Sequence, residues 1–249
     1  MTPFDRGAPL KGLTVLVTGG GRGIGRACAL ACADAGARVI AVARTGSDLE
    51  EVSALANGRV EAWVADVTHA GFWHELGSRH DLDVVVNNAG TNKLQDIENV
   101  DDDTLDLMLD LNVRSAFKVS QAAVTALTRR GAGGSIIHIS SQMGHAGAPK
   151  RSVYCMTKHA IEGLTKAMAI ELAPRRIRVN AVAPTIVETS MTRPFLEDPS
   201  YRAFAMATIP MQQIATPSDV AEAVVYLASP AARLVTGLSL KVDGGATAQ

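Results

Sequence analysis

Residues 13–43 read LTVLVTGGGRGIGRACALACADAGARVIAVA, and this stretch decides the fold. It opens on a short apolar run at 13–17, which predicts a buried strand. A glycine-rich loop at 18–25 follows, then an alanine-rich stretch at 26–35 that is typical of a helix, and a second strand at 38–43. Strand, loop, helix and strand in this order form a βαβ unit, whose right-handed crossover leaves the two strands parallel.

The glycine loop has the setting of a phosphate-binding site. A loop that joins a strand to a helix N-terminus aims backbone N–H groups at a pyrophosphate. The glycines fit G-x-x-x-G-x-G at Gly19, Gly23 and Gly25 rather than the common G-x-G-x-x-G. A glycine-rich turn without a ligand is the alternative, and the strand–helix context argues against it. The stretch therefore predicts a dinucleotide site.

The end of the second strand indicates which dinucleotide binds. An acidic residue there bonds the adenosine ribose 2′-OH when the cofactor is NAD. Here the position is Ala43, followed by Arg44, so no carboxylate repels a 2′-phosphate and a planar guanidinium is present to pair with it. Arg22 in the loop is a second candidate cation. NADP(H) is favoured, NAD(H) stays possible, and a solvated loop arginine is the alternative role for Arg44.

The rest of the chain continues the alternation of strands and helices. Further strands are predicted at 60–65, 82–86, 135–140, 177–182 and 238–242, and long helices at 101–130, 153–173 and 218–228, the last capped by Ser218. The pattern predicts an α/β fold: a single doubly wound Rossmann domain over 1–249, with a seven-stranded parallel sheet and helices on both faces. Residues 190–217 carry four prolines, and we expect them to be irregular and to act as a mobile substrate lid.

Composition excludes several classes of protein. With 249 residues, 47% of them hydrophobic, and a net charge of −1, the chain gives no electrostatic case for nucleic acid or a membrane surface. Its three cysteines, Cys28, Cys32 and Cys155, lack the spacing of a metal site or a disulfide framework. Residues 1–11 lack the apolar run of a signal peptide. We expect a cytoplasmic protein without a metal.

Tyr154 and Lys158 stand four residues apart in the helix predicted at 153–173, and therefore on one face of it. A free phenol has a pKa of about 10 and is a poor base at neutral pH. A neighbouring ammonium favours the phenolate, which lowers that pKa and suits the phenol to proton transfer in a hydroxyl/carbonyl interconversion. Ser141 follows the strand predicted at 135–140 and reaches the same sheet edge as the glycine loop.

Together these residues resemble the short-chain dehydrogenase/reductase family over essentially the whole chain. The motifs that carry the resemblance are Thr18 to Gly25, Asp66, Asn87 to Gly90, Asn112, Ser141, Tyr154-x-x-x-Lys158 and Pro184 to Met191. The resemblance implies an oxidoreductase that interconverts a secondary alcohol and a ketone by hydride transfer.

The resemblance also implies the roles of a catalytic tetrad. Tyr154 is the acid/base, and Ser141 holds the substrate oxygen. Lys158 binds the nicotinamide ribose and depresses the pKa of Tyr154. Asn112 breaks the helix ladder and holds a water that links Lys158 to solvent.

For the cofactor, Asn87 and Gly90 are expected to line the adenosine and phosphate channel, although a structural role for Asn87 is an equal alternative. Asp66 with Val67 is expected to hold the adenine, and Val187 with Thr189 to anchor the carboxamide. The full expected cofactor set is Gly19, Gly21, Arg22, Gly23, Ile24, Arg44, Asp66, Val67, Asn88, Ala89, Gly90, Tyr154, Lys158, Pro184, Val187, Thr189 and Met191. One departure from the family is Thr185 where glycine is frequent, a side chain that narrows the nicotinamide pocket or shifts the next loop.

Beside Tyr154, Arg151 is a candidate to recognise a substrate carboxylate bidentately, with Gln142 and His145 adding polar contacts. A solvated Lys150–Arg151 pair and a loop histidine are the alternative. We expect a small polar or anionic substrate such as a hydroxy acid, sugar acid or polyol. Aromatic residues make up 4% of the chain and are few in the lid, which disfavours a steroid.

Two other functions are weighed against this one. A 3-oxoacyl thioester (acyl-carrier-protein) reductase is the rival within the family. A catalytically silent nucleotide-binding scaffold would be expected to lose Tyr154, Lys158 or Ser141, and this chain keeps all three. The resemblance further implies a homo-oligomer, a dimer or tetramer paired through the two long helices, where small residues such as Ala160 and Ala167 permit close packing.

Overall fold

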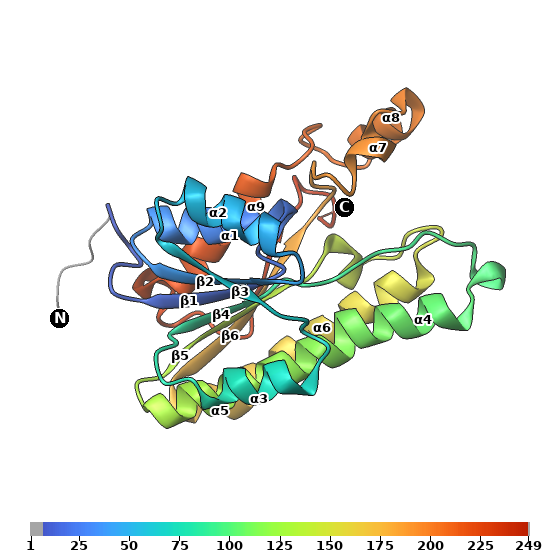
Figure 1. Cartoon of the computed structure of the whole chain (residues 1–249). Coiled ribbons are helices and arrows are strands. Elements are labelled where there is room, and N and C mark those ends of the chain that lie inside the picture. The colour runs from blue at the N-terminus through green and yellow to red at the C-terminus, as the bar shows by residue number, and fades with distance from the viewer. Residues whose placement is uncertain (1–6, 249) are drawn as a thin grey trace.

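A computed structural model of the chain describes residues 7–248, and its seven parallel strands form one sheet in the order β3-β2-β1-β4-β5-β6-β7. The predicted doubly wound α/β fold is confirmed (Figure 1). The strand order reverses between β1 and β4, the point at which such sheets bind ligands beyond the carboxyl ends of the strands. The strands are β1 (Thr14–Thr18), β2 (Arg38–Ala43), β3 (Val60–Val64), β4 (Val84–Asn87), β5 (Gly134–Ile139), β6 (Ile177–Pro184) and β7 (Ser239–Val242).

Helices cover both faces of the sheet (Figure 1). One face packs against α1 (Gly23–Asp34), α2 (Gly46–Leu55) and α9 (Pro217–Ala228). The other packs against α3 (Ala70–Ser78), α5 (Ser115–Arg130) and α6 (Ser152–Leu172). Successive side chains of a strand point to opposite faces, so Val15 and Val17 belong to the first core and Leu16 to the second. Cys28 and Cys32 lie buried in the first core, as expected of small apolar residues.

The helix predicted at 101–130 is interrupted. It consists of α4 (Asp102–Leu109), a π-helical turn at Asp110–Arg114 and α5. Asp101 caps α4, because its carboxylate accepts a hydrogen bond of 2.6 Å from the backbone N–H of Thr104. In Figure 1, α4 continues the line of α5 beyond the sheet.

Two expectations for the C-terminal third are wrong in detail. Residues 190–217 are not irregular throughout, since they contain α7 (Arg193–Leu196) and α8 (Pro199–Ala207), each with a proline in its first turn. We call residues 190–216 the lid segment; it stands apart from the sheet at the upper right of Figure 1. The cap of α9 is Thr216 rather than Ser218, because Thr216 and Asp219 form a reciprocal capping box.

Among residues 7–248, no helix combines the length and apolarity needed to cross a membrane. The N-terminal residues 1–6, part of the stretch searched above for a signal peptide, lie outside the described residues.

Candidate active site

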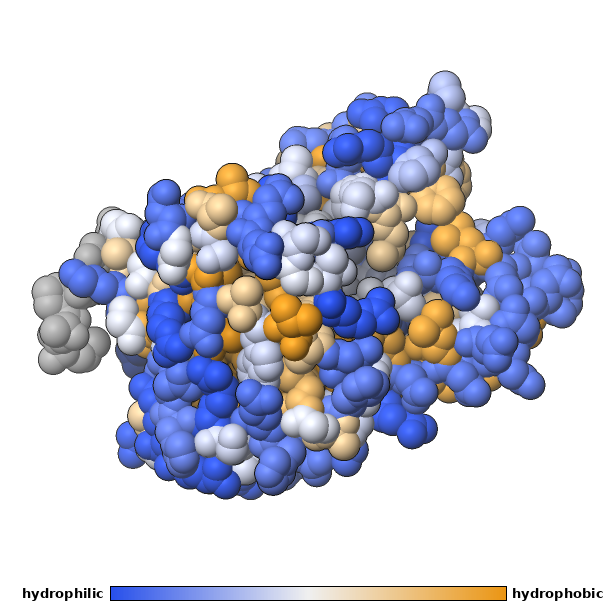
Figure 2. All heavy atoms as spheres, viewed as in Figure 1, coloured by the Kyte–Doolittle hydropathy of each residue, from blue (hydrophilic) through white to orange (hydrophobic). Residues whose placement is uncertain are grey.

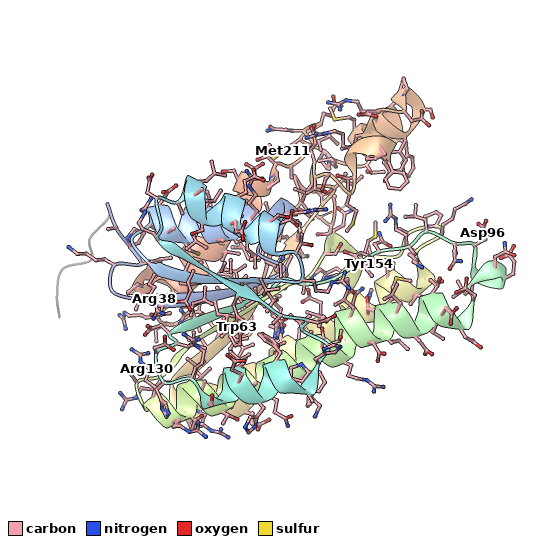
Figure 3. All side chains as sticks on the ribbon, in the orientation of Figure 1. Arg38, Trp63, Asp96, Arg130, Tyr154 and Met211 are labelled. Carbon is pink, nitrogen blue, oxygen red and sulfur yellow. The ribbon has the colours of Figure 1, made fainter. Side chains whose placement is uncertain are left out.

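A cavity of about 620 Å³ opens at the carboxyl edge of the sheet. Figure 2 shows a hollow in this face directly below the lid segment, and Figure 3 shows that Tyr154 also lies below the lid segment. Five segments line the cavity: the glycine loop, residues 88–94, residues 139–143, the first turns of α6, and the chain from Pro184 to the lid segment. Of the expected set, Gly19, Arg22, Gly23, Ile24, Asn88, Ala89, Gly90, Ser141, Gln142, Arg151, Tyr154, Lys158, Pro184, Val187, Thr189 and Met191 lie along it.

Three positions of the glycine loop require glycine, two because of their φ angles and one because of close packing. Gly19 and Gly23 have φ angles of +65° and +53°, in the left-handed region that favours glycine. A Cβ on Gly25 would lie 2.1 Å from the carbonyl oxygen of Gly19. The loop leads directly into α1, which begins at Gly23, so its backbone N–H groups and the helix N-terminus fit a pyrophosphate.

The loop is tied to β4 across the switch point. The Thr18 hydroxyl accepts hydrogen bonds from the backbone N–H groups of Asn88 and Ala89, and the Asn88 amide donates to the Thr18 carbonyl at 2.9 Å. Asn87 does not line the cavity as expected; its buried amide donates to the Ala116 carbonyl at 2.7 Å. Its role is to hold α5 on the sheet.

The adenosine end of the site is less basic than the sequence suggested. Arg22 is paired with Asp48 at 2.6 Å, so its charge is already balanced. Arg44 is more available, with a side chain 77% exposed and its nearest carboxylate, Asp66, 4.0 Å away. Asp66 accepts from the backbone N–H and hydroxyl of Thr68, which lowers its pKa against the opposing effect of burial. Gly21, Arg44, Asp66 and Val67 lie outside the cavity lining.

The residues predicted to transfer the proton meet where β5 ends and α6 begins. Ser141 caps a short turn at Gln142–Gly144 in an extended conformation, and its hydroxyl also lies close enough to Tyr154 to lower the pKa of the phenol. Lys158 is buried, its Nζ donates 2.8 Å to the carbonyl of Ile139, and the same atom lies 5.5 Å from the centroid of the Tyr154 ring. The sequence-predicted constellation of Ser141, Tyr154 and Lys158 is therefore brought together in space.

Burial has the largest effect on the pKa values of Tyr154 and Lys158. In this structure burial raises the pKa of Tyr154, while the neighbouring Ser141 hydroxyl and the charge of Arg151 act to lower it. Burial also lowers the pKa of Lys158 from the usual 10.5 to about 8, against the opposing effect of Glu162. Arg151, one turn before Tyr154, is a further cation whose charge acts to lower the pKa of the phenol.

Asn112 lies in the π-helical turn, so it does interrupt the helix ladder as the resemblance implied. Its side chain is buried and makes paired hydrogen bonds of 2.8 Å with the backbone N–H and carbonyl of Thr91. A third contact, 3.3 Å, joins its amide to the Thr157 hydroxyl on α6. Asn112 thus joins the cavity-lining segment at Thr91 to the helix that carries Tyr154 and Lys158. The solvent-facing role typical of a mid-helix amide is excluded.

Of the three proposed substrate contacts, two face the cavity. Gln142 lines it, and Arg151 donates a hydrogen bond of 3.1 Å to the Tyr201 hydroxyl on α8. His145 does not line the cavity, because its Nε2 turns to the Ser239 hydroxyl at 2.9 Å and to Glu162 at 3.2 Å. Glu162 is buried, and it is a neighbour of the site that the sequence patterns above did not predict. Its spacing of four residues from Lys158 on one helix is the feature from which this proximity could have been predicted.

The lid segment contributes aromatic residues to the cavity, although such residues are few in the chain as a whole. Phe195 and Tyr201 line the cavity, with ring centroids 5.9 Å apart. Thr192 stabilises the segment that precedes the lid helices, because its hydroxyl donates a hydrogen bond to the Val187 carbonyl and accepts one from the Thr189 backbone N–H. Thr185 lines the cavity too, and its buried hydroxyl has no hydrogen-bond partner among residues 7–248.

Comparison with known proteins agrees with this geometry. A family model described as enoyl-(acyl carrier protein) reductase matches residues 19–247. L-xylulose reductase of Mesocricetus auratus is 40% identical over 237 residues, covering 95% of this chain and 97% of that protein. The chain belongs to the short-chain dehydrogenase/reductase family.

Two other similar proteins extend the comparison. Carbonyl reductase 2 of Sus scrofa, whose name specifies NADPH, is 38% identical over 94% of this chain and 96% of that protein. A crystal structure described as a putative NAD(P)-dependent gluconate 5-dehydrogenase from Beutenbergia cavernae, with bound NADP, superposes with a TM-score of 0.92 at 38% identity, covering 98% and 100% of the two chains. As a member of the family, the protein is an oxidoreductase that acts on CH–OH groups with a nicotinamide cofactor.

Proposed function

We propose that this dehydrogenase/reductase interconverts the ketone and secondary alcohol of a small polyhydroxy acid, such as a sugar acid, with NADP(H). The observation that carries the substrate class is Arg151. It lines the cavity beside Tyr154, and it has no carboxylate partner among residues 7–248; its hydrogen bond goes to the neutral hydroxyl of Tyr201. A substrate carboxylate would balance this charge.

The chain's own residues account for the proton and for positioning. The bound nicotinamide supplies or accepts the hydride. In the direction of reduction, Tyr154 donates its phenolic proton to the carbonyl oxygen, which Ser141 holds by a hydrogen bond. The charge of Arg151 stabilises the phenolate that Tyr154 becomes, because it already lowers the pKa of that phenol. Lys158 lies one turn further along α6, where its ammonium also favours the phenolate.

Unpartnered polar atoms suit the rest of such a substrate. Buried oxygens of Asn92 and Gln142 have no hydrogen-bond donor in the described chain, and both residues line the cavity. A buried acceptor without a donor is costly, so these atoms favour a ligand that brings hydroxyl groups. Arg151 for the carboxylate and amide oxygens for the hydroxyls together favour a polyhydroxy acid over a plain ketone.

For the cofactor, we propose that Arg44 contacts the 2′-phosphate of NADP. It is the exposed arginine that directly follows β2, and its contact with Asp66 is long at 4.0 Å. Relatives that are named for NADPH or crystallised with NADP support this preference. NAD(H) remains the alternative cofactor.

A substrate panel tests the proposal. Sugar acids, neutral polyols and ketoses, and acyl thioesters are each assayed with NADP(H) and NAD(H) by nicotinamide absorbance. We expect the highest kcat/KM for a sugar acid with NADP(H). Arg151→Ala should raise KM for the acid by roughly 10- to 100-fold, the value of a lost charge-assisted hydrogen bond, and leave KM of the matched neutral polyol nearly unchanged.

Other outcomes would change the assignment. Equal effects of Arg151→Ala on acidic and neutral substrates would remove the carboxylate from the proposal and favour a neutral sugar. A clear preference for the acyl thioester would favour the rival 3-oxoacyl reductase. Cofactor oxidation that persists in Tyr154→Phe would mean that the proton donor is a different group.

We also propose that the protein is a homo-oligomer paired through α5 and α6, and that the lid segment is mobile. Phe117, Met156 and Ile170 on these two helices are 48%, 47% and 80% exposed, which is unusual for large apolar side chains on adjacent helices. Light scattering coupled to size-exclusion chromatography distinguishes a monomer, a dimer and a tetramer. Hydrogen exchange over residues 190–216, with and without NADP, tests the mobility.

A further inference from the structure

A second cavity lies at the opposite end of the sheet from the active site. It measures about 560 Å³, and it opens where β4, β5 and β6 begin and where the chain passes from α9 to β7. Its floor is partly apolar, with Leu13, Val84 and Ile177 among the lining residues. The catalytic residues all lie at the carboxyl ends of the strands, so this cavity is separate from the site described above.

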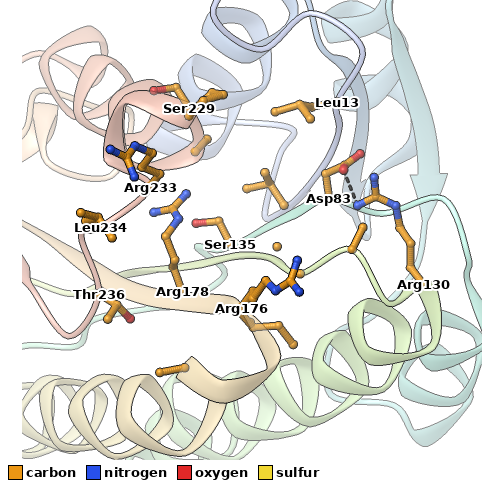
Figure 4. A pocket seen from close by; sticks show the side chains of 18 residues that line it. Leu13, Asp83, Arg130, Ser135, Arg176, Arg178, Ser229, Arg233, Leu234 and Thr236 are labelled. Atoms are coloured by element: carbon orange, nitrogen blue, oxygen red, sulfur yellow. Dashed lines mark ion pairs between the residues drawn. The ribbon is translucent and has the colours of Figure 1, made fainter. Parts of the chain in front are cut away.

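Four arginines line this cavity: Arg130, Arg176, Arg178 and Arg233 (Figure 4). The acidic residue among the lining residues is Asp83, and it forms an ion pair with Arg130. The other three arginines have no carboxylate partner within residues 7–248. Three uncompensated positive charges around one concave space are an unusual concentration in a chain of net charge −1.

Arg178 carries the argument furthest. It extends from β6, it is half-buried, and its guanidinium donates to the carbonyls of Leu227 at 2.7 Å and Val235 at 3.3 Å. A guanidinium has five N–H donors, so these two carbonyls leave others unused. Burial lowers the pKa of Arg178 below its usual value. A guanidinium does not give up its proton, so Arg178 keeps its positive charge although it is half-buried. An anion beside it would stabilise that charge.

The backbone at Arg176 is held in a strained conformation that places this residue at the rim. Arg176 has a φ of +57°, in the left-handed region, which costs a non-glycine residue free energy. A Cβ on Gly133 would lie 2.5 Å from the Arg176 carbonyl oxygen, so this approach requires glycine, and Gly134 donates its N–H to the same carbonyl. The turn that presents Arg176 is therefore built into the fold.

We propose that this arginine cavity binds a phosphate-bearing small molecule, a phosphate monoester or inorganic phosphate, held by Arg176, Arg178 and Arg233. Guanidinium groups match phosphate oxygens bidentately. The volume is in the range of ligand sites and exceeds what a bare ion fills, and the apolar floor suits the carbon part of a monoester. The proposal does not depend on the substrate or cofactor assigned to the active site.

Titration calorimetry tests this on the full chain saturated with NADP, so that the cofactor site is occupied. The probes are inorganic phosphate and glycerol 3-phosphate, with glycerol and with sodium chloride at matched ionic strength as controls. We expect saturable binding of one phosphate compound per chain. Tighter binding of glycerol 3-phosphate identifies the monoester as the ligand class, and tighter or equal binding of phosphate identifies the free anion.

Variants locate the site. Arg176→Ala combined with Arg233→Ala should weaken binding by roughly tenfold or more, because charge-assisted hydrogen bonds are lost. Arg175→Ala is the matched control: it removes the same charge from an exposed neighbour outside the cavity lining and should leave binding unchanged. Enzyme activity, expected unchanged in all variants, shows that they are folded. No saturable binding in the wild type, or equal binding in the double variant, would overturn the proposal.

Discussion

The Arg151 guanidinium donates a hydrogen bond of 3.1 Å to the Tyr201 hydroxyl, and so joins the beginning of α6 to the lid segment across the mouth of the active-site cavity. The two residues are fifty positions apart in the sequence. Tyr201 also lies against Phe195 and Phe204, with ring centroids 5.9 and 6.4 Å away. This contact couples the proposed carboxylate-binding residue to the position of the lid.

Tyr201→Phe removes the hydroxyl and keeps the ring. We expect KM for the preferred substrate to rise about two- to tenfold, the worth of one hydrogen bond, since the lid loses its polar tie to Arg151. Steady-state kinetics measure the change. Ser200→Ala, at an exposed neighbour whose hydroxyl donates a hydrogen bond to Asp198, is the control and should have no effect. An unchanged KM in Tyr201→Phe would mean that the hydrogen bond between Arg151 and the lid does not contribute to substrate binding.

Arg44→Ala should change the preference between cofactors. The loss of a guanidinium at the 2′-phosphate should raise KM for NADPH by roughly 10- to 100-fold and leave KM for NADH nearly constant. Arg26, which pairs with Glu51 on the same side of the fold and lies outside the cavity lining, provides the control variant Arg26→Ala. If both variants lose NADPH affinity equally, the effect belongs to general charge rather than to Arg44.

Gly25→Ala should abolish the cofactor site or the fold around it. Its Cβ would stand 2.1 Å from the Gly19 carbonyl oxygen and 2.5 Å from the Asn88 amide nitrogen, and neither has room to move far. A Cβ added at Gly163 on α6 would meet nothing within 4 Å. Gly163→Ala should therefore leave the free energy of unfolding unchanged or raise it by up to about 1 kcal/mol. NADP binding by fluorescence and the free energy of unfolding distinguish the two. Full cofactor affinity in Gly25→Ala would contradict the close packing of the loop.

Lys158→Met should inactivate the enzyme and stabilise it at neutral pH. Burial lowers the pKa of Lys158 from 10.5 to about 8, so below pH 8 the folded state holds a charge that the unfolded state accommodates more easily. That cost disappears as the pH rises from 8 to 10.5, because the unfolded state then releases its proton too.

We expect Lys158→Met to gain about 1–3 kcal/mol at pH 7 and less at pH 10, measured by urea unfolding without cofactor. The exposed Lys166→Met on the same helix should show no such gain. Equal stability of Lys158→Met and wild type at pH 7 would mean that the hydrogen bond to Ile139 fully offsets the burial of the charge.

His138 should make the fold sensitive to acid. Its ring is buried on β5 between the hydroxyls of Ser120 and Thr165, at 3.0 and 2.9 Å, and burial lowers its pKa from 6.5 to about 4. The folded state therefore keeps the ring neutral while the unfolded state takes up a proton below pH 6.5, so stability falls as the pH drops from 6.5 to 4.

The expected loss from this one group is about 2 kcal/mol between pH 7 and pH 5. His138→Gln should flatten the decline over this range, even though its stability at pH 7 is lower than that of the wild type. The exposed His74→Gln is the control and should retain the full decline. A pH dependence unaltered in His138→Gln would assign the acid sensitivity to other groups.

The sequence by itself determined the sheet, the glycine loop and the placement of the candidate proton-transfer residues, because each has a local signature. Strands are short apolar runs, the loop needs glycine where a Cβ would collide with Gly19 or Asn88, and a spacing of four places Tyr154 and Lys158 on one helix face. Even here, the boundaries moved by one or two residues, as for β1 at Thr14–Thr18 rather than 13–17.

Tertiary structure decided the features that depend on residues distant in the sequence. His145 contacts Ser239 and Glu162, Arg22 forms an ion pair with Asp48, and Arg151 donates a hydrogen bond to Tyr201. No local sequence pattern predicts these contacts. Burial, which sets the pKa of Tyr154 and Lys158, is likewise a property of the packed chain. The physical reason is that periodicity and spacing report on neighbours within a few residues, whereas charge pairing and desolvation depend on what the fold brings alongside.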